Sequence, residues 1–144
     1  MDKRISSRGI IIQDDKLLTI FRRKIKDGEV KEYYVIPGGG LEEGETLEEN
    51  VTRELNEELG IDITIDGFVG MRETDTTIEY YFDCTITNGT PTIGGEEKDR
   101  MSENNYYEVT YIPVNKISEY DLQGQNFILK ALNKEYTDLN TIRK

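Results

Sequence analysis

The chain has 144 residues, the length of one domain, and a net charge of −11 with no histidine. This acidity argues against a nucleic-acid polymer or an anionic membrane as the main partner, because both require a basic protein surface. The lack of histidine excludes histidine-ligated zinc and leaves proton transfer to carboxylates, lysine or tyrosine. One cysteine, Cys84, rules out an intramolecular disulfide. Because neither a signal peptide nor a membrane-spanning run is found, we expect a cytoplasmic protein.

The first 24 residues have the pattern of a β-hairpin. Residues 4–12 end in an apolar run, Asp14 and Asp15 indicate a turn, and residues 16–21 resume an extended pattern. The second strand closes with three cations, Arg22, Arg23 and Lys24. A charged strand end in solvent would explain them. A contact with a phosphate is the less favoured alternative, because a guanidinium can donate two parallel hydrogen bonds to phosphate oxygens.

A glycine-rich turn and then a helix follow a short strand at residues 32–36. Three consecutive glycines come after Pro37 and indicate a tight turn. Thr46 has the position of an N-cap, and Glu49 three residues later completes a capping box. Gly60 stands where a helix-terminating glycine belongs. These signals predict a helix between Thr46 and Gly60.

Two stripes of side chains run along this predicted helix. The apolar stripe consists of Val51, Leu55 and Leu59. The acidic stripe consists of Glu54, Glu57 and Glu58. The two stripes lie roughly 100° apart on the helix, which places the carboxylates at the edge of the packed face. Because like charges at this spacing repel, they require a counter-charge, either Arg53 or, more fittingly, Mg²⁺ or Mn²⁺. A functionless acidic surface helix is the alternative.

The second half predicts strands, a polar loop and a closing helix. Residues 62–71 and 76–87 have strand patterns, and the second of these alternates most clearly, with one apolar face made of Ile78, Tyr80, Phe82, Cys84 and Ile86. A polar loop spans residues 94–105, and a strand at residues 106–112 stops at Pro113. From Leu122 we expect a helix that packs through Phe127, Leu129, Ala131 and Leu132, followed by a frayed tail from Thr137.

The glycine loop and the helix together carry a spaced motif. Its members are Gly39, Glu45, Arg53, Glu54, Leu55, Glu57, Glu58, Gly60 and Ile61. This stretch of 23 residues resembles the Nudix box of the MutT-like Nudix hydrolases, with no departure from its pattern.

The resemblance implies a fold and a reaction. It implies one α/β (α+β) domain over residues 1–144, an α/β/α sandwich with a mixed sheet between helices. The reaction would be attack of water on a pyrophosphate bond in a nucleoside diphosphate linked to another moiety, with Mg²⁺ or Mn²⁺. Nucleotide triphosphates, ADP-ribose and nucleotide sugars are all possible substrates, and the chain's small size slightly favours a triphosphate. The alternative is a non-catalytic Nudix-fold nucleotide sensor. A homodimer is the commonest assembly.

The resemblance also implies roles for particular residues. Glu54, Glu57 and Glu58 would bind the metal, joined by the carbonyl of Gly39. Arg53, together with Glu45, would orient these glutamates. The general base would be Glu54 or a carboxylate of the late polar loop. Glu97 is our choice for a further metal ligand in that loop, with Glu96 and Glu103 as rivals. For the substrate we expect Arg22, Arg23 and Tyr34, although Tyr34 could equally be structural.

Overall fold

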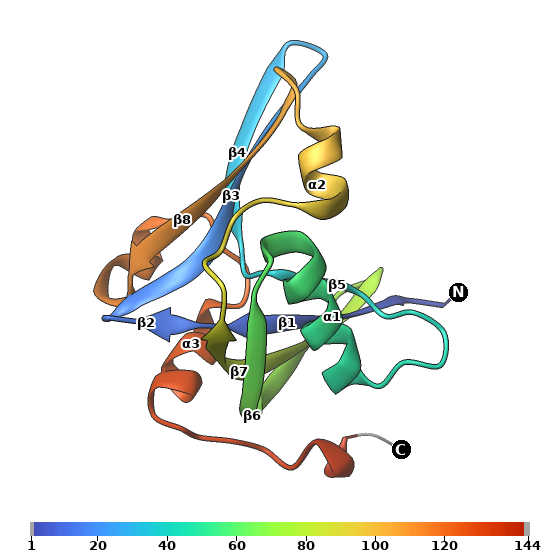
Figure 1. Ribbon diagram of the computed structural model, residues 1–144, viewed down its shortest axis with the longest axis vertical. Helices are drawn as coiled ribbons and strands as arrows, with labels where there is room; N and C mark the ends of the chain where they lie inside the picture. Colours follow the sequence, from blue (N-terminus) through green and yellow to red (C-terminus); the bar gives the residue numbers. More distant parts are fainter. Residues whose placement is uncertain (1, 143–144) are drawn as a thin grey trace.

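The computed structural model describes residues 2–142, apart from the side chains of Glu96 and Glu97. Two four-stranded sheets form its framework (Figure 1). The first sheet has the order β5 (Gly38–Gly40), β1 (Arg4–Ile10), β7 (Thr77–Asn88) and β6 (Asp62–Glu73). It is mixed, because β1 runs parallel to β7 and antiparallel to β5. The second sheet is antiparallel and consists of β2 (Ile12–Gln13), β3 (Lys16–Lys26), β4 (Glu29–Val35) and β8 (Asn105–Pro113).

Helices cover both faces of the first sheet. On one face, Val51, Leu55 and Leu59 of α1 (Leu47–Leu59) are fully buried in a core that includes Phe82 and Cys84. On the other face, α3 (Gln125–Leu132) packs through the buried side chains Phe127, Ile128 and Ala131 against Tyr81 and Val69. The predicted α/β/α sandwich with a mixed sheet is therefore confirmed. Among the described residues, no helix is long and apolar enough to cross a membrane.

The local signals at both ends of α1 act as predicted. The Thr46 hydroxyl accepts a hydrogen bond from the Glu49 amide at 3.0 Å, and the Glu49 carboxylate accepts one from the Thr46 amide at 2.9 Å. Gly60 ends the helix with a φ of 68°, a left-handed conformation that glycine adopts without steric cost. These caps fix where the helix begins and ends, and so fix which way its acidic stripe faces.

The second sheet projects from the body of the molecule. Strand β3 is 11 residues long and pairs with β4 on one side and β8 on the other. Figure 1 shows the β3–β4 hairpin and β8 extending away from the first sheet, with the short helix α2 (Gly95–Arg100) beside them. The glycine strand β5 follows β4 along the chain and contacts α1, so it connects the projecting sheet to this helix.

The predicted first hairpin is only partly present. Asp14 and Asp15, at φ values of 53° and 60°, make the expected turn, but it joins β3 to the two-residue strand β2. The longer strand β1 instead pairs with β5 and β7. The chain changes sheets at Ile11, whose side chain is buried in the core. An apolar run that serves two sheets has the same sequence pattern as one continuous strand.

Three expectations for the second half were wrong. Residues 95–100 form the helix α2 and not a loop. In α3 the packing face contains Ile128, while Leu129 is 63% exposed and Leu132 is 38% exposed. The described part of the tail is not frayed, because the Thr137 amide donates to the Phe68 carbonyl at 2.8 Å and Leu139 is buried in the first-sheet core. A short 3-10 helix, η2 (Leu139–Thr141), holds this end, and another, η1 (Val114–Glu119), follows β8.

Candidate functional site

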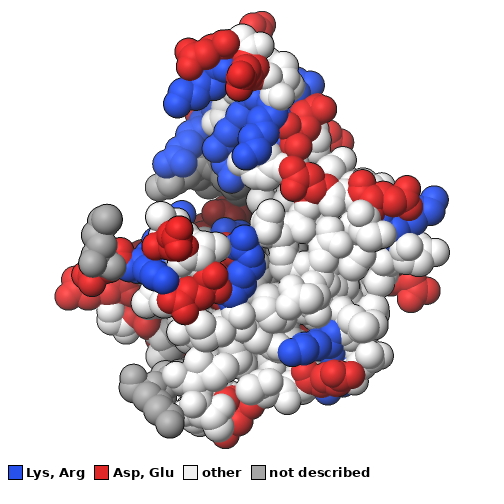
Figure 2. Space-filling model, turned by 180° about the vertical axis from the view of Figure 1, so that it is seen from behind, with Lys and Arg blue, Asp and Glu red and all other residues white. Residues whose placement is uncertain are grey.

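A cleft of about 560 Å³ separates the acidic helix from the projecting sheet. Its walls come from α1, from all three residues of β5, and from side chains of β1, β3, β4, α2 and β8. Figure 2 shows a hollow between the projecting part and the body, with lysine and arginine side chains gathered on the projecting part. The cleft therefore joins an acidic wall to a basic one in a protein whose net charge is −11.

The acidic wall contains the three glutamates expected from the sequence. Glu54, Glu57 and Glu58 all line the cleft, together with Gly39. The Glu54 side chain is 12% exposed and that of Glu57 is 56% exposed. A Cβ atom at Gly39 would lie 2.5 Å from the carboxyl carbon of Glu54, far inside contact distance. Only glycine at this position lets the Glu54 carboxylate reach the β5 backbone.

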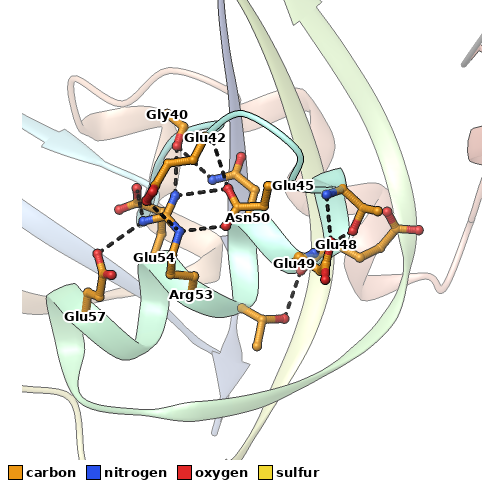
Figure 3. Close-up of polar contacts among 11 residues, drawn as sticks. Gly40, Glu42, Glu45, Glu48, Glu49, Asn50, Arg53, Glu54 and Glu57 are labelled. Carbon is orange, nitrogen blue, oxygen red and sulfur yellow. Dashed lines mark hydrogen bonds and ion pairs between the residues drawn. The ribbon is translucent and has the colours of Figure 1, made fainter.

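Arg53 connects this wall to the glycine loop (Figure 3). Its Nε donates to Glu45 at 2.6 Å, and its Nη1 donates to both Glu54 and Glu57 at 3.1 Å. Its Nη2 donates to the Gly40 carbonyl at 3.0 Å and to Glu45 at 3.1 Å. Glu42 is a further ion-pair partner, with its carboxylate 3.3 Å from Nε. One guanidinium thus orients carboxylates from the loop and from the helix.

The charges around Arg53 shift its titration and that of its closest partner. The hydrogen bond from Arg53 lowers the pKa of Glu45 below its ordinary value. The same hydrogen bond raises the pKa of Arg53, and the charge of Glu54 adds to this effect. Both members of the Arg53–Glu45 pair are therefore ionised in the folded protein at neutral pH.

Asn50 is a second residue that holds the glycine loop, and it was not among the site residues predicted from the sequence. Its side chain is completely buried, and its Nδ2 donates to the Gly40 carbonyl at 3.0 Å. Gly40 therefore receives hydrogen bonds from both Asn50 and Arg53. The signal that could have found this role is an asparagine within the predicted helix, four positions before Glu54 and so on the same face.

The basic wall is built from several elements. Its cations are Arg4 and Arg8 of β1, Arg22 and Lys24 of β3, and Arg100 of α2. Arg22 is fixed by aromatic neighbours: its guanidinium lies 4.8 Å from the Tyr107 ring centre and 5.5 Å from that of Tyr33. It also donates to the Tyr107 hydroxyl at 3.1 Å. These cations line the same cleft as the acidic helix and give it groups suited to phosphate.

Two residues expected at the substrate lie elsewhere. Arg23 follows Arg22 on the same strand and so points to the opposite face, where its guanidinium lies 5.2 Å from the Tyr106 ring centre. Tyr34 packs with Phe21 and Tyr120 and belongs to the core beneath α3. Neither residue is among the described residues that line the cleft. For Tyr34, the structural role left open by the sequence agrees with this placement.

The late polar segment adds little that can be placed. The side chain of Glu97, like that of Glu96, lies outside the described residues. Glu103 is exposed and is not among the described residues that line the cleft. The described contribution of this segment to the cleft is Arg100, at the end of α2.

The acidic wall offers the type of ligand atom that suits a divalent cation. Its donors are carboxylate oxygens, which Mg²⁺ and Mn²⁺ prefer. Among the described residues, no three carboxylates stand together as a ready-made cation site. Figure 3 shows that Glu54 and Glu57 both turn to Arg53. The ion pair between Arg53 and the half-exposed Glu57 contributes little energy, because solvent screens it. The Glu57 carboxylate is therefore available to a divalent cation.

Comparisons with known proteins agree with the fold and the motif. The family model of the NUDIX domain matches residues 3–128. An ADP-ribose pyrophosphatase of Methanocaldococcus jannaschii is 33% identical over 107 residues, 73% of this chain and 62% of that protein. An 8-oxo-dGTP diphosphatase of Proteus vulgaris is 39% identical over 56 residues, 39% of this chain and 49% of that protein. The matches thus span less than two thirds of either curated relative.

A solved structure of a NUDIX hydrolase from Nitrosomonas europaea has the same fold. The TM-score is 0.72 at 16% identity, and the match covers 97% of this chain and 95% of that chain. At this identity the likeness concerns the fold alone. The family match, by contrast, spans most of the sequence and includes the complete box from Gly39 to Ile61. The chain therefore belongs to the NUDIX family.

Proposed function

We propose that this protein is a metal-dependent pyrophosphohydrolase that cleaves a nucleoside diphosphate linked to another moiety. The observation that carries the proposal is the cleft itself, which the box glutamates of α1 share with arginines and a lysine from three other elements. A pyrophosphate needs cations on both of its sides, because its charge is dense and must be neutralised before water can attack it. A bound cation would serve one side and the arginines the other.

Glu54, Glu57 and Glu58 would hold Mg²⁺ or Mn²⁺, with the backbone of Gly39 close by. The metal, when bound, would supply charge neutralisation for the pyrophosphate and a lowered pKa for water. The carboxylates must leave Arg53 in part to bind a cation. This costs little at Glu57, which is more than half exposed.

The protein's own groups would position the reaction. Arg53 fixes Glu54 relative to the glycine loop through the Gly40 carbonyl and Glu45, so these parts move as one unit. Glu54 lies against β5 and is mostly shielded from water, which makes it our choice for the carboxylate that accepts a proton from the attacking water. A carboxylate of the late polar segment, residues 94–105, is the alternative.

The chemistry of the cleft and the names of the relatives suggest the order in which substrates should be tested. The basic wall suits a small polyphosphate, and Tyr33 and Tyr107 add aromatic rings beside Arg22. A relative with 33% identity is named an ADP-ribose pyrophosphatase, and another is named an 8-oxo-dGTP diphosphatase. ADP-ribose and nucleoside triphosphates are therefore the first substrates to test, followed by nucleotide sugars.

The test is a substrate panel with identified products. Wild-type protein is incubated with ADP-ribose, ordinary and oxidised nucleoside triphosphates, and nucleotide sugars, each with Mg²⁺ or Mn²⁺. Formation of a nucleoside monophosphate together with pyrophosphate or a sugar phosphate supports the proposal and names the substrate. Absence of turnover on every member, with ligand binding retained, would instead support the sensor.

A single substitution ties the activity to the acidic wall. Glu57→Gln removes one carboxylate charge from the cleft and should abolish most metal-dependent turnover with the fold intact. Glu43→Gln is the matched control, because Glu43 is exposed and is not among the described residues that line the cleft. Wild-type rates in the Glu57 variant would refute the assignment.

A further inference from the structure

A buried carboxylate behind the basic wall is not part of the acidic wall or of the Nudix box. Glu79 of β7 is 9% exposed. Its Oε2 accepts a hydrogen bond from Arg8 Nε at 2.7 Å, and its Oε1 accepts one from Arg72 Nη1 at 2.9 Å. The Tyr81 hydroxyl donates to the same Oε1 at 3.2 Å. Three donors therefore hold one carboxylate in a single orientation.

The cluster carries an excess of positive charge. Glu79 contributes one negative charge, and Arg8 and Arg72 contribute two positive charges. Burial alone would raise the pKa of Glu79, but the charge and hydrogen bond of Arg8 and the bond from Arg72 lower it overall. The carboxylate is thus ionised in the folded protein, and one positive charge in the cluster remains unbalanced. Such an excess suits an anion.

Arg8 is the member of the cluster that faces the cleft. Its Nε is bound to Glu79, and its Nη1 donates to the Ile36 carbonyl at 2.8 Å. Within the described part of the chain, its Nη2 has no hydrogen-bond partner. The guanidinium is held from behind by protein atoms while its side chain lines the cleft. An arginine fixed in this way is prepared to bind an anion with little further loss of freedom.

The glycine strand separates Arg8 from the glutamates. A Cβ at Gly39 would meet the Glu54 carboxylate, whereas Gly38 is paired with Arg8 and a Cβ there would lie 2.7 Å from Arg8 Cα. A Cβ at Gly40 would lie 3.1 Å from Arg4 Nη2. Because alternate residues of a strand face opposite sides, Glu54 and the two arginines of β1 stand on opposite faces of β5. All of them line the same cleft.

We infer that Arg8 binds a phosphoryl group of the substrate from the face of β5 opposite the glutamates, and that Glu79 is the positioning residue that holds Arg8 there. The inference rests on the proposed function, because it assigns one phosphoryl contact within that cleft. Arg72 completes the neutralisation of Glu79 from outside the cleft, where its Nη2 donates to Gln123 at 3.0 Å. The parallel pairing of β1 with β7 places Ser6 opposite Glu79 and so brings this carboxylate within reach of Arg8.

The first test uses inorganic pyrophosphate as the probe, titrated calorimetrically without metal. Arg8→Met should weaken pyrophosphate binding about tenfold, the loss expected for one charge-assisted contact. Arg72→Gln is the matched control, because it also removes a guanidinium from Glu79 but leaves Arg8 in place; its affinity should stay within about twofold of wild type. Equal affinities in wild type and Arg8→Met would overturn the inference.

The second test separates position from charge. Glu79→Gln raises the net charge near the cleft by one positive unit, so a purely electrostatic role predicts tighter pyrophosphate binding. The positioning role predicts weaker binding, about fivefold, because Arg8 loses the group that fixes it. With a substrate that the wild type hydrolyses, KM should rise by a similar factor and kcat should change by less than about twofold. Unchanged or tighter binding would overturn the role of Glu79.

The outcomes keep the two proposals distinct. If Glu79→Gln does not fold, as judged by circular dichroism and thermal unfolding, Arg8→Met and Arg72→Gln still decide whether Arg8 binds the anion. A wild type that hydrolyses substrate while Arg8→Met binds pyrophosphate normally refutes this inference and leaves the proposed function standing. A wild type that hydrolyses nothing while Arg8→Met binds pyrophosphate weakly refutes the hydrolase and leaves the anion site standing.

Discussion

Two ion-pair centres flank the glycine strand, and they are built with opposite proportions. On one face, a single guanidinium, Arg53, is shared among four carboxylates: Glu42, Glu45, Glu54 and Glu57. On the other face, a single carboxylate, Glu79, is shared between two guanidinium groups, Arg8 and Arg72. The first centre has a surplus of negative charge and the second a surplus of positive charge. The first therefore suits a cation and the second an anion.

This difference explains how an acidic protein can accept a polyphosphate. The net charge of −11 describes the whole chain, whereas the cleft gathers its negative and positive side chains on two separate walls. A ligand that carries its own metal, with phosphates on one side and the cation on the other, matches both walls at once. The glycines permit this arrangement, because a side chain at Gly39 would displace Glu54 and one at Gly38 would collide with the backbone of β1.

The largest effect is expected from removing the shared guanidinium of the acidic centre. Arg53→Ala leaves partly buried carboxylates facing one another, so we expect activity to fall about 100-fold and the free energy of unfolding to fall by about 2 kcal/mol. Steady-state kinetics and urea unfolding measure the two effects. Arg53→Lys is the control, because lysine keeps the positive charge but lacks the planar guanidinium with its several donors. Full activity in Arg53→Lys would show that the geometry of the guanidinium does not matter.

The next effect comes from the contact between β5 and the acidic wall. Gly39→Ala places a Cβ 2.5 Å from the Glu54 carboxyl carbon, so this flexible side chain must move. We expect activity to fall roughly tenfold or more, since small displacements of reacting groups are costly, with little loss of stability. Gly40→Ala is the matched control, because its new methyl group meets only the end of Arg4. Equal activities in the two variants would count against a special role for Gly39.

Metal binding should raise the free energy of unfolding. At about 100 times its dissociation constant, Mg²⁺ should raise the free energy of unfolding by about 2.7 kcal/mol. Glu57→Gln should lose most of this gain, whereas Arg8→Met should keep it, because Arg8 belongs to the other centre. Thermal unfolding with and without Mg²⁺ provides the measurement. A gain that survives in Glu57→Gln would place the cation elsewhere.

The smallest effect concerns acid stability. Glu45 and Glu79 both have a pKa below the ordinary value of 4.5, so the unfolded chain takes up protons at these positions before the folded chain does. Their stabilising contribution is fully present above pH 4.5 and is lost as the pH falls through the folded-state values. Urea unfolding from pH 6 to about pH 3 should show this loss. It should be shallower in Glu79→Gln; an identical slope would contradict the shift.

The sequence predicted the acidic centre better than the basic one for a physical reason. The caps of α1 and its two stripes are local patterns, with partners three to eight positions apart, so the direction of the glutamates follows from helix geometry. Arg8 and Glu79 are 71 positions apart and meet only through the parallel pairing of β1 and β7. The alternation in β7 did identify a core-facing side, but the other side is buried by α3 as well.

Other differences have the same origin. The apolar residues of α3 admit more than one packing face, and contact with Tyr81 and Val69 selects the one with Ile128 in place of Leu129. The sequence alone could not distinguish Arg22 from Arg23 as a cleft residue. The pairing of β3 with β4 and β8 decides which face of the strand meets the cleft, and this is the face of Arg22. The roles of the site residues, the cytoplasmic location and the homodimer stay predictions.

The most direct measurement is a crossed calorimetric titration of two variants with two probes. Mn²⁺ and, separately, metal-free pyrophosphate are titrated into wild type, Glu57→Gln and Arg8→Met. We predict that Glu57→Gln loses Mn²⁺ affinity and retains pyrophosphate affinity, and that Arg8→Met does the reverse. If both variants lost the same probe, or neither lost any, the separation of cation and anion across the glycine strand would be wrong.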